Sequence, residues 1–143
     1  MNIKEWSEKN YQIIYLIAMI GVGLWVAYIK GWIFANFQSI SAKEAIKLIK
    51  ENRYPIIDIR DNTSWNKGHI KGAIHIPLNN LENNISKIVP YKNSKILVYS
   101  QSGVNSIKAS RFLSKKGFQV INIKSGILGL AIEGAKYPNL FSK

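Results

Sequence analysis

Residues 96–117, ILVYSQSGVNSIKASRFLSKKG, contain the pattern around which the rest of the chain is organised. The apolar run from Ile96 to Tyr99 predicts a buried strand, and a loop of small polar residues, 100–105, follows it. A helical pattern then begins at Ser106 and ends near Gly117, which suits a C-terminal cap. This order of strand, loop and helix directs loop N–H groups and the positive end of a helix toward one point, which suits an anion or a thiolate.

Strands and helices alternate through the remainder of residues 41–143. Ser41 and Glu44 form the pattern of a capping box at the start of a helix. Further strands are expected at 55–60, 73–76 and 118–123, partly helical structure at 78–89, and a final helix at 126–134. The alternation predicts an α/β fold, a parallel sheet flanked by helices. Ligands of such sheets bind at the carboxyl ends of the strands, where Ser100 lies.

The N-terminal region has the composition of a membrane anchor. A polar N-terminus, 1–9, precedes the uncharged and mostly apolar stretch 10–29, which would be about 30 Å long as a helix, one hydrocarbon thickness. Aromatic residues lie near both ends of this stretch and Lys30 closes it. We therefore expect a single transmembrane helix at 10–30 and a linker at 31–40. A cleaved signal peptide and a buried helix are the alternatives.

Basic residues near the span indicate its orientation. Two lysines precede it, whereas four follow it at positions 30, 43, 47 and 50. By the positive-inside rule, this difference predicts a single-pass protein of the cell (inner) membrane with its domain in the cytoplasm.

The net charge of +12 rests on 17 lysines and only three arginines. Because the chain is also rich in Ile and Asn, much of the lysine excess fits an AT-rich genome, and we expect no specific nucleic-acid partner. Nine basic residues and the single acid Glu133 follow residue 90. A face with this charge is either a solvated surface or one attracted to anionic headgroups. The absence of cysteine excludes disulfides and thiolate metal sites, and no cofactor or metal is expected.

Three stretches resemble rhodanese-like domains. The stretch 56–78, IIDIRDNTSWNKGHIKGAIHIPL, is similar to the opening motif of that family, and 117–130, GFQVINIKSGILGL, to its closing motif. The loop resembles the family's active loop, Cys-x-x-Gly-x-Arg-Ser. Gly103 and Ser106 match this pattern, but Ser100 takes the cysteine position and Asn105 the arginine position. An anchor followed by one such domain resembles a membrane-anchored rhodanese-like family of bacteria.

The resemblance implies a rhodanese-like sheet, but the residues argue against sulfur transfer. A serine hydroxyl forms no stable persulfide, and Asn105 lacks the cation that such loops use on an anionic substrate. We predict no catalytic residue and a degenerate domain that binds a protein partner at or near the membrane. The alternatives are a sulfur relay that uses a partner's cysteine and an unrecognised serine chemistry. The candidate ligand-binding residues are Ser100, Gln101, Ser102, Gly103, Val104, Asn105 and Ser106.

Other polar residues of the motifs have structural interpretations. We expect Asp58 and Arg60 to fix the end of their strand by hydrogen bonds, His69 to fix a turn, and His75 to be a half-buried strand residue. A second candidate for partner binding is a basic helix face formed by three residues, Lys108, Arg111 and Lys115.

Overall fold

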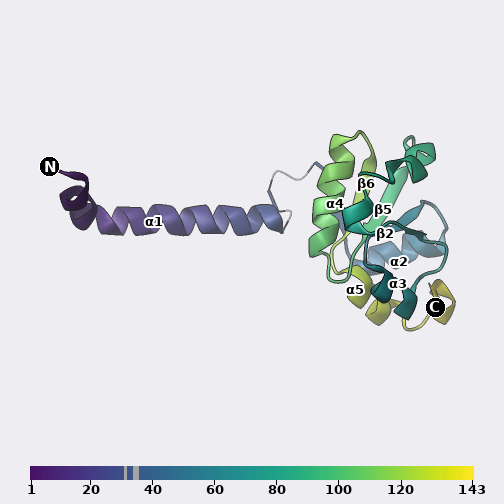
Figure 1. Cartoon of the computed structure of the whole chain (residues 1–143). Helices are drawn as coiled ribbons and strands as arrows, with labels where there is room; N and C mark the ends of the chain where they lie inside the picture. The colour runs from purple at the N-terminus through teal and green to yellow at the C-terminus, as the bar shows by residue number, and fades with distance from the viewer. Residues whose placement is uncertain (31, 34–35) are drawn as a thin grey trace. The chain divides into compact units, whose positions relative to one another are not determined.

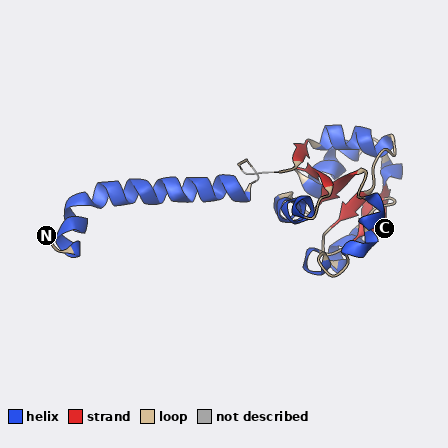
Figure 2. Cartoon of the chain, turned by 90° about the horizontal axis from the view of Figure 1, so that it is seen from above, coloured by secondary structure: helices blue, strands red, loops and turns tan. Residues whose placement is uncertain are grey.

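The structure is a computed structural model that describes residues 1–30, 32–33 and 36–143. The chain divides into two units, Met1–Phe34 and Ala35–Lys143, which are described separately. Figures 1 and 2 show the helices and strands of both.

The first unit contains one long helix, α1 (Ile3–Ile29), which has no buried residue along its described length. Its start is fixed by a capping box, in which the Glu5 N–H donates to Asn2 Oδ1 at 2.8 Å. Asn10 departs from helical geometry, with φ −116° and ψ 18°, and its Nδ2 donates to the Trp6 carbonyl at 2.7 Å. By length and composition α1 can cross a membrane.

The second unit is an α/β domain around a five-stranded parallel sheet, as the alternating pattern predicts. Its strands lie in the order β1 (Gln38–Ile40), β6 (Gln119–Ile123), β5 (Lys95–Tyr99), β2 (Ile56–Asp58) and β4 (Ile74–His75). A separate antiparallel pair joins β3 (His69–Ile70) to β7 (Phe141–Ser142). The remaining elements are α2 (Ala42–Lys50), α3 (Asn62–Lys67), α4 (Val104–Lys115), α5 (Gly126–Gly134) and the 3-10 helices Leu78–Asn80, Ile85–Lys87, Val89–Tyr91 and Pro138–Leu140.

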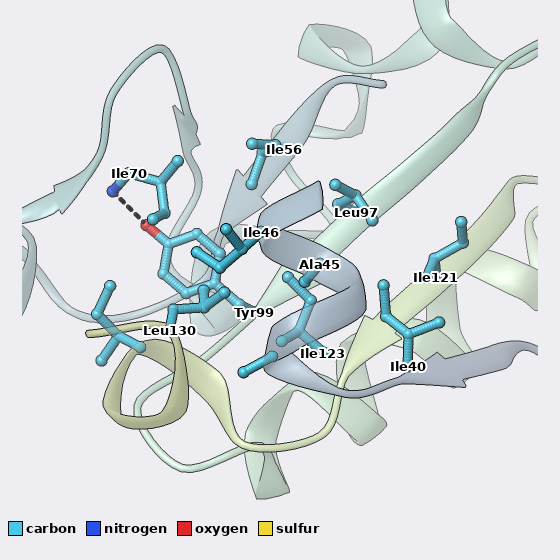
Figure 3. Packing of buried hydrophobic residues seen from close by; sticks show 12 residues of the cluster. Ile40, Ala45, Ile46, Ile56, Ile70, Leu97, Tyr99, Ile121, Ile123 and Leu130 are labelled. Carbon is cyan, nitrogen blue, oxygen red and sulfur yellow. Dashed lines mark hydrogen bonds between the residues drawn. The ribbon is translucent and has the colours of Figure 1, made fainter. Parts of the chain in front are cut away.

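Two hydrophobic clusters lie on opposite faces of the sheet. Along β5, Leu97 and Tyr99 belong to the cluster under α2 and α5, whereas Ile96 and Val98 belong to the cluster under α4. This alternation follows from the two-residue period of a strand. Figure 3 shows the first cluster, in which Tyr99 and Ile46 lie close together. Burial on both faces makes β5 a central strand, so its carboxyl end is held in a fixed place.

Three local expectations differ from the structure. Residues 38–40, expected within the linker, form β1 and pair with β6 at the sheet edge. Helix α4 begins at Val104 rather than Ser106, because Gly103 has φ +95° and ends the loop in a left-handed turn. Arg111 does not belong to an exposed basic face: it is buried, with 8% of its surface accessible, whereas Lys108 and Lys115 are exposed.

Candidate functional site

The loop after β5 is held by its own side chains. Ser100 is buried, with 3% of its surface accessible, and its Oγ accepts a hydrogen bond from the Gly103 N–H at 3.1 Å. The buried Ser106 Oγ donates to the Gly103 carbonyl at 3.0 Å. The two hydroxyls thus fix the N–H and the carbonyl group of Gly103. A cysteine thiolate at position 100 could accept the same N–H.

The N-terminus of α5 holds the loop from a second direction. The Ile127 N–H donates to the Ser100 carbonyl at 2.8 Å, and the Leu128 N–H lies 3.4 Å from the Gln101 carbonyl. Gly126 permits this approach, because its φ is +57° and a Cβ there would collide with the backbone of Ser100 and Gln101. The first N–H groups of α5 therefore bind the carbonyl groups of the loop. The first N–H groups of α4, like those of any helix, have no acceptor within their own helix.

Gly103 is required by the packing of the loop against β6. A Cβ on this residue would overlap the carbonyl group of Lys124, which directly follows β6. The loop therefore lies against the backbone at the end of the next strand. No larger residue fits here without moving one of the two segments.

The end of β2, next to the loop, is fixed by a buried ion pair. Arg60 Nη2 lies 2.7 Å from Asp58 Oδ2, and Arg60 Nε lies 3.0 Å from the same oxygen. Arg60 Nη2 also donates to the Gly68 carbonyl at 2.7 Å. Burial lowers the pKa of the Arg60 guanidinium, but the hydrogen bonds and charge of Asp58 outweigh it and raise the pKa above its ordinary value. The guanidinium therefore stays charged, and the hydrogen bonds of Asp58 and Arg60 fix the strand end as the sequence predicts.

Trp65 is stacked between the two histidines. Its ring lies 3.4 Å from the His69 ring and 4.5 Å from the His75 ring, centroid to centroid and nearly parallel. His69 Nδ1 lies 3.0 Å from the Trp65 carbonyl, and His75 Nε2 lies 2.8 Å from the Arg60 carbonyl. Both histidines are half-buried, and these bonds go to the backbone. This agrees with the expectation that His69 fixes a turn and that His75 is a half-buried strand residue.

Tyr99 joins the loop strand to β3. Its hydroxyl oxygen accepts the Ile70 N–H at 3.1 Å, as Figure 3 shows. Burial, with the nearby Asp58 carboxylate, raises the pKa of the Tyr99 hydroxyl far above its ordinary value. The phenol therefore stays neutral and acts as a support beneath the site.

A cavity of about 220 Å³ lies between these strand ends. Its polar atoms are mainly amides and hydroxyls, and its one carboxylate is Asp61. The Asp61 carboxylate accepts the Ser64 N–H at 2.7 Å, which holds its pKa below the ordinary value and keeps it charged. Because Asp58 neutralises Arg60, the charge of Asp61 is not balanced within the lining of the cavity. Its lining residues are Ile59, Arg60, Asp61, Ser64, Pro77, Leu78, Asn79, Ser100, Gln101 and Asn105.

The structure brings only part of the expected ligand-binding loop to this cavity. Ser100, Gln101 and Asn105 line the cavity. The other four residues do not: Ser102 and Val104 are exposed, and Gly103 and Ser106 are buried. The part of the cavity formed by residues after β2 and β4 is not among the sequence-based expectations. The available signal was that parallel strands end at one edge, so the segments after positions 58 and 75 also had to lie there. Among the described residues, no cluster of His, Cys, Asp and Glu suits a metal ion.

The chain is similar to several curated proteins. It is 30% identical over 118 residues to YibN of Escherichia coli (strain K12), covering 76% of this chain and 82% of that protein. It is 32% identical over 80 residues to the thiosulfate sulfurtransferase PspE of the same organism, covering 56% of this chain and 77% of that one.

Solved structures share the fold. A rhodanese-related protein from Thermoplasma volcanium superposes with a TM-score of 0.63 at 28% identity, covering 68% of this chain and 94% of that one. SSP1007 from Staphylococcus saprophyticus gives the same TM-score at 25% identity, covering 68% of this chain and 97% of that one. The sequence model of the rhodanese-like domain matches residues 41–133. With the sheet and the loop described above, this match shows that the chain belongs to the rhodanese-like domain family.

Proposed function

We propose that this protein is a single-pass membrane protein whose rhodanese-like domain binds a polar group of a partner protein and does not itself transfer sulfur. The observation that carries the proposal is the state of the loop. Ser100 is seated, buried and hydrogen-bonded where the family has its cysteine, and the chain has no cysteine at any position. Hydrogen bonds hold the loop in place although it has no sulfur nucleophile.

Serine chemistry finds no support around Ser100. An activated serine needs an adjacent base that a third group orients. The described hydrogen bonds of both histidine rings go to the backbone carbonyls of Trp65 and Arg60. The described contact of Ser100 Oγ is with an N–H donor, which does not remove a proton.

The cavity lining suggests the class of ligand. Amides from Asn79, Gln101 and Asn105 and hydroxyls from Ser64 and Ser100 offer both donors and acceptors. The charged Asp61 disfavours a multiply charged anion such as thiosulfate. A peptide amide, or a single carboxylate reached by the N–H groups at the start of α4, fits this lining better.

A sulfur relay is the second candidate. Two relatives have names that concern sulfur: PspE is a thiosulfate sulfurtransferase, and YrkF of Bacillus subtilis is a putative sulfur carrier protein. In a relay, this domain would bind the persulfide-bearing segment of a partner and position it near Ser100. The sulfur would remain on the partner's cysteine throughout.

Sulfurtransferase assays of the full chain in detergent test whether the domain itself transfers sulfur. We expect no thiosulfate:cyanide activity in the unmodified protein. Ser100→Cys should create a thiol whose pKa is lowered by the Gly103 N–H and by α4, so its alkylation should begin at lower pH than that of Ser102→Cys, an exposed control in the same loop. Adding Asn105→Arg should raise turnover further, because a guanidinium binds an anionic donor. Activity in the unmodified protein would refute the binding proposal.

Photocrosslinking in membranes tests the partner. A photoreactive residue at Gln101 or Asn79, both on the cavity wall, should give a discrete adduct, whereas the same residue at the exposed Asn52 should not. An adduct that disappears when partner cysteines are blocked would favour the relay. Equal adducts at all three positions would mean that the cavity is not the binding site.

The anchor and its orientation are part of the proposal. The full chain should stay with the membrane after carbonate extraction, and a domain in the cytoplasm should resist protease added to intact cells. Release into the soluble fraction would refute the anchor. Digestion in intact cells would reverse the orientation.

A further inference from the structure

The amino ends of the sheet strands carry a concentration of positive charge. No Asp or Glu occurs between Glu82 and Glu133, a stretch that includes β5, α4 and β6. Four exposed lysines of this stretch lie at the turns that lead into β5 and β6; they are Lys92, Lys95, Lys115 and Lys116, called here the basic end.

Contacts show that these two turns lie side by side. Lys95 is in register with Gln119 at the start of β6, and Lys92 Nζ lies 5.7 Å from the centre of the Phe118 ring. Lys116 Nζ lies 5.5 Å from the centre of the Phe112 ring. The two ammonium groups thus lie over aromatic rings, and both lysines remain exposed.

Exposed apolar residues lie next to this charge. Val89 has 52% of its surface accessible and Tyr91 has 38%, and both belong to the 3-10 helix that precedes Lys92. Lysines mixed with exposed aromatic and aliphatic side chains are typical of surfaces that lie at a membrane–water interface.

The chain enters the domain at the same end. Strand β1 is parallel to β6, so Gln38 lies at the amino ends of the strands, opposite the Ser100 loop. The preceding Phe37 packs against the cluster that contains Phe118 and that Phe112 also contacts. Gln38 follows Lys30 by eight positions, which permits a separation of at most about 29 Å at full extension. An anchor in the membrane therefore limits how far the amino ends of the strands can move from the lipid surface.

From this arrangement we infer that the basic end binds the anionic phosphate headgroups of the bilayer in which α1 is anchored. The inference rests on the proposed anchor. Headgroup phosphates complement the lysines. Their attraction acts over about 8–10 Å in physiological salt, and the short tether permits an approach to within that distance. The opposite end of the sheet carries mixed charge, including Glu44, Asp61 and Glu82. Docking by the basic end directs the Ser100 cavity away from the lipid, toward a partner in solution.

The absence of cysteine makes this testable with single labels on the full chain. Asn93 lies between the lysines of the basic end, and Asn79 lies on the cavity wall. Fluorophores at Asn93→Cys or Asn79→Cys would report energy transfer to acceptor-labelled headgroups in lipid nanodiscs. The discs contain either phosphatidylcholine alone or a mixture with phosphatidylglycerol.

We expect transfer from position 93 to rise several-fold in anionic discs and to fall again at high salt, while transfer from position 79 stays low in both. Replacing the four lysines of the basic end by Gln should abolish the rise. A matched variant that loses the same charge elsewhere, at the exposed Lys67, Lys71, Lys124 and Lys136, should retain it.

Four outcomes would overturn the inference. If the chain is embedded but energy transfer from position 93 does not depend on lipid charge, the basic end does not bind headgroups and the anchor still stands. The same conclusion follows if both lysine variants lose the rise in transfer equally. A chain that elutes apart from both kinds of disc refutes the anchor as well as this inference. Binding of a DNA duplex by the full chain, lost in the basic-end variant and accompanied by no response to lipid charge, would assign the surface to nucleic acid.

Discussion

The two neighbouring strands β2 and β5 end side by side, with Asp58 in register with Tyr99, yet their ends are fixed by different means. The end of β2 depends on a buried ion pair whose charges satisfy each other and the Gly68 carbonyl. The end of β5 depends on backbone groups, held by two hydroxyls and by the N-terminus of α5.

This difference explains how the loop can lack a nucleophile and remain in shape. At β2 the identity of both side chains matters, because removing one leaves the other as an uncompensated charge. At β5 the residue at position 100 needs only to accept one N–H, and the Ser100 hydroxyl does so. The buried charges of Asp58 and Arg60 therefore stabilise the fold, whereas position 100 can hold a residue other than cysteine without loss of the loop structure.

The largest effect is expected at the ion pair. Arg60→Met should lower the free energy of unfolding by about 3–5 kcal/mol, because Asp58 would stay buried without a partner. Arg53→Met is the control, since Arg53 and Glu51 are exposed and 3.8 Å apart, and it should change stability by less than about 0.5 kcal/mol. Denaturant unfolding measures both. Similar midpoints for the two variants would mean that the buried pair is not what fixes β2.

Next in size is Gly103→Ala. The substitution combines a positive φ with a collision against the Lys124 carbonyl group, so we expect a loss of at least the roughly 1–3 kcal/mol of backbone strain alone. Gly72→Ala shares the positive φ but meets no atom within 4 Å, and should show the strain only. The difference between the two unfolding midpoints measures the contact between loop and β6. No difference would contradict that contact.

A smaller effect is expected for Ser100→Ala. Removing the acceptor of the Gly103 N–H should cost about 1 kcal/mol, which is the usual net value of one hydrogen bond. Ser102→Ala, at an exposed position of the same loop, should stay within about 0.5 kcal/mol of the unmodified protein. If Ser100→Ala unfolded the domain, position 100 would matter to the fold as much as the ion pair does.

The smallest effect concerns pH and Asp61. Its pKa is lowered in the folded state by the Ser64 N–H, so its contribution to stability is complete above its ordinary value of 3.8 and is lost as pH falls through the lower, folded value. Asp61→Asn can still cap α3 but cannot titrate. The stability difference between the two proteins should therefore change only below about pH 4. A difference that changes near neutral pH would point to another group.

The sequence predicts the central part of this fold well and its edges poorly. Residues 96–99 are a continuous apolar run, and 120–123 are apolar except for Asn122, as suits strands buried on both faces. Strand β1 has only three residues, QSI, without an alternating pattern, and forms because β6 offers it a partner. Arg111 shares a helical spacing with Lys108 and Lys115, but α4 is buried over a wider face than its apolar residues suggest.

The site shows the same limit. The loop at 100–106 is visible in the sequence because small polar residues interrupt two periodic segments. The far wall of the cavity, at 59–61 and 77–79, depends on which strands become neighbours, and no local pattern records that choice. The engagement of Arg60 by Asp58 is likewise a result of packing, and it decides how much positive charge the cavity offers.

The stacking of Trp65 between two imidazoles gives the domain an optical signal of its own. The other three tryptophans of the chain, Trp6, Trp25 and Trp32, lie outside residues 36–143. Trp65 directly follows Ser64, which lines the cavity, so a ligand that moves this wall changes the overlap of the three rings. Replacing the three N-terminal tryptophans by Phe would leave an emission that reports this wall alone. Screening for what the cavity binds then requires no label and no enzymatic turnover.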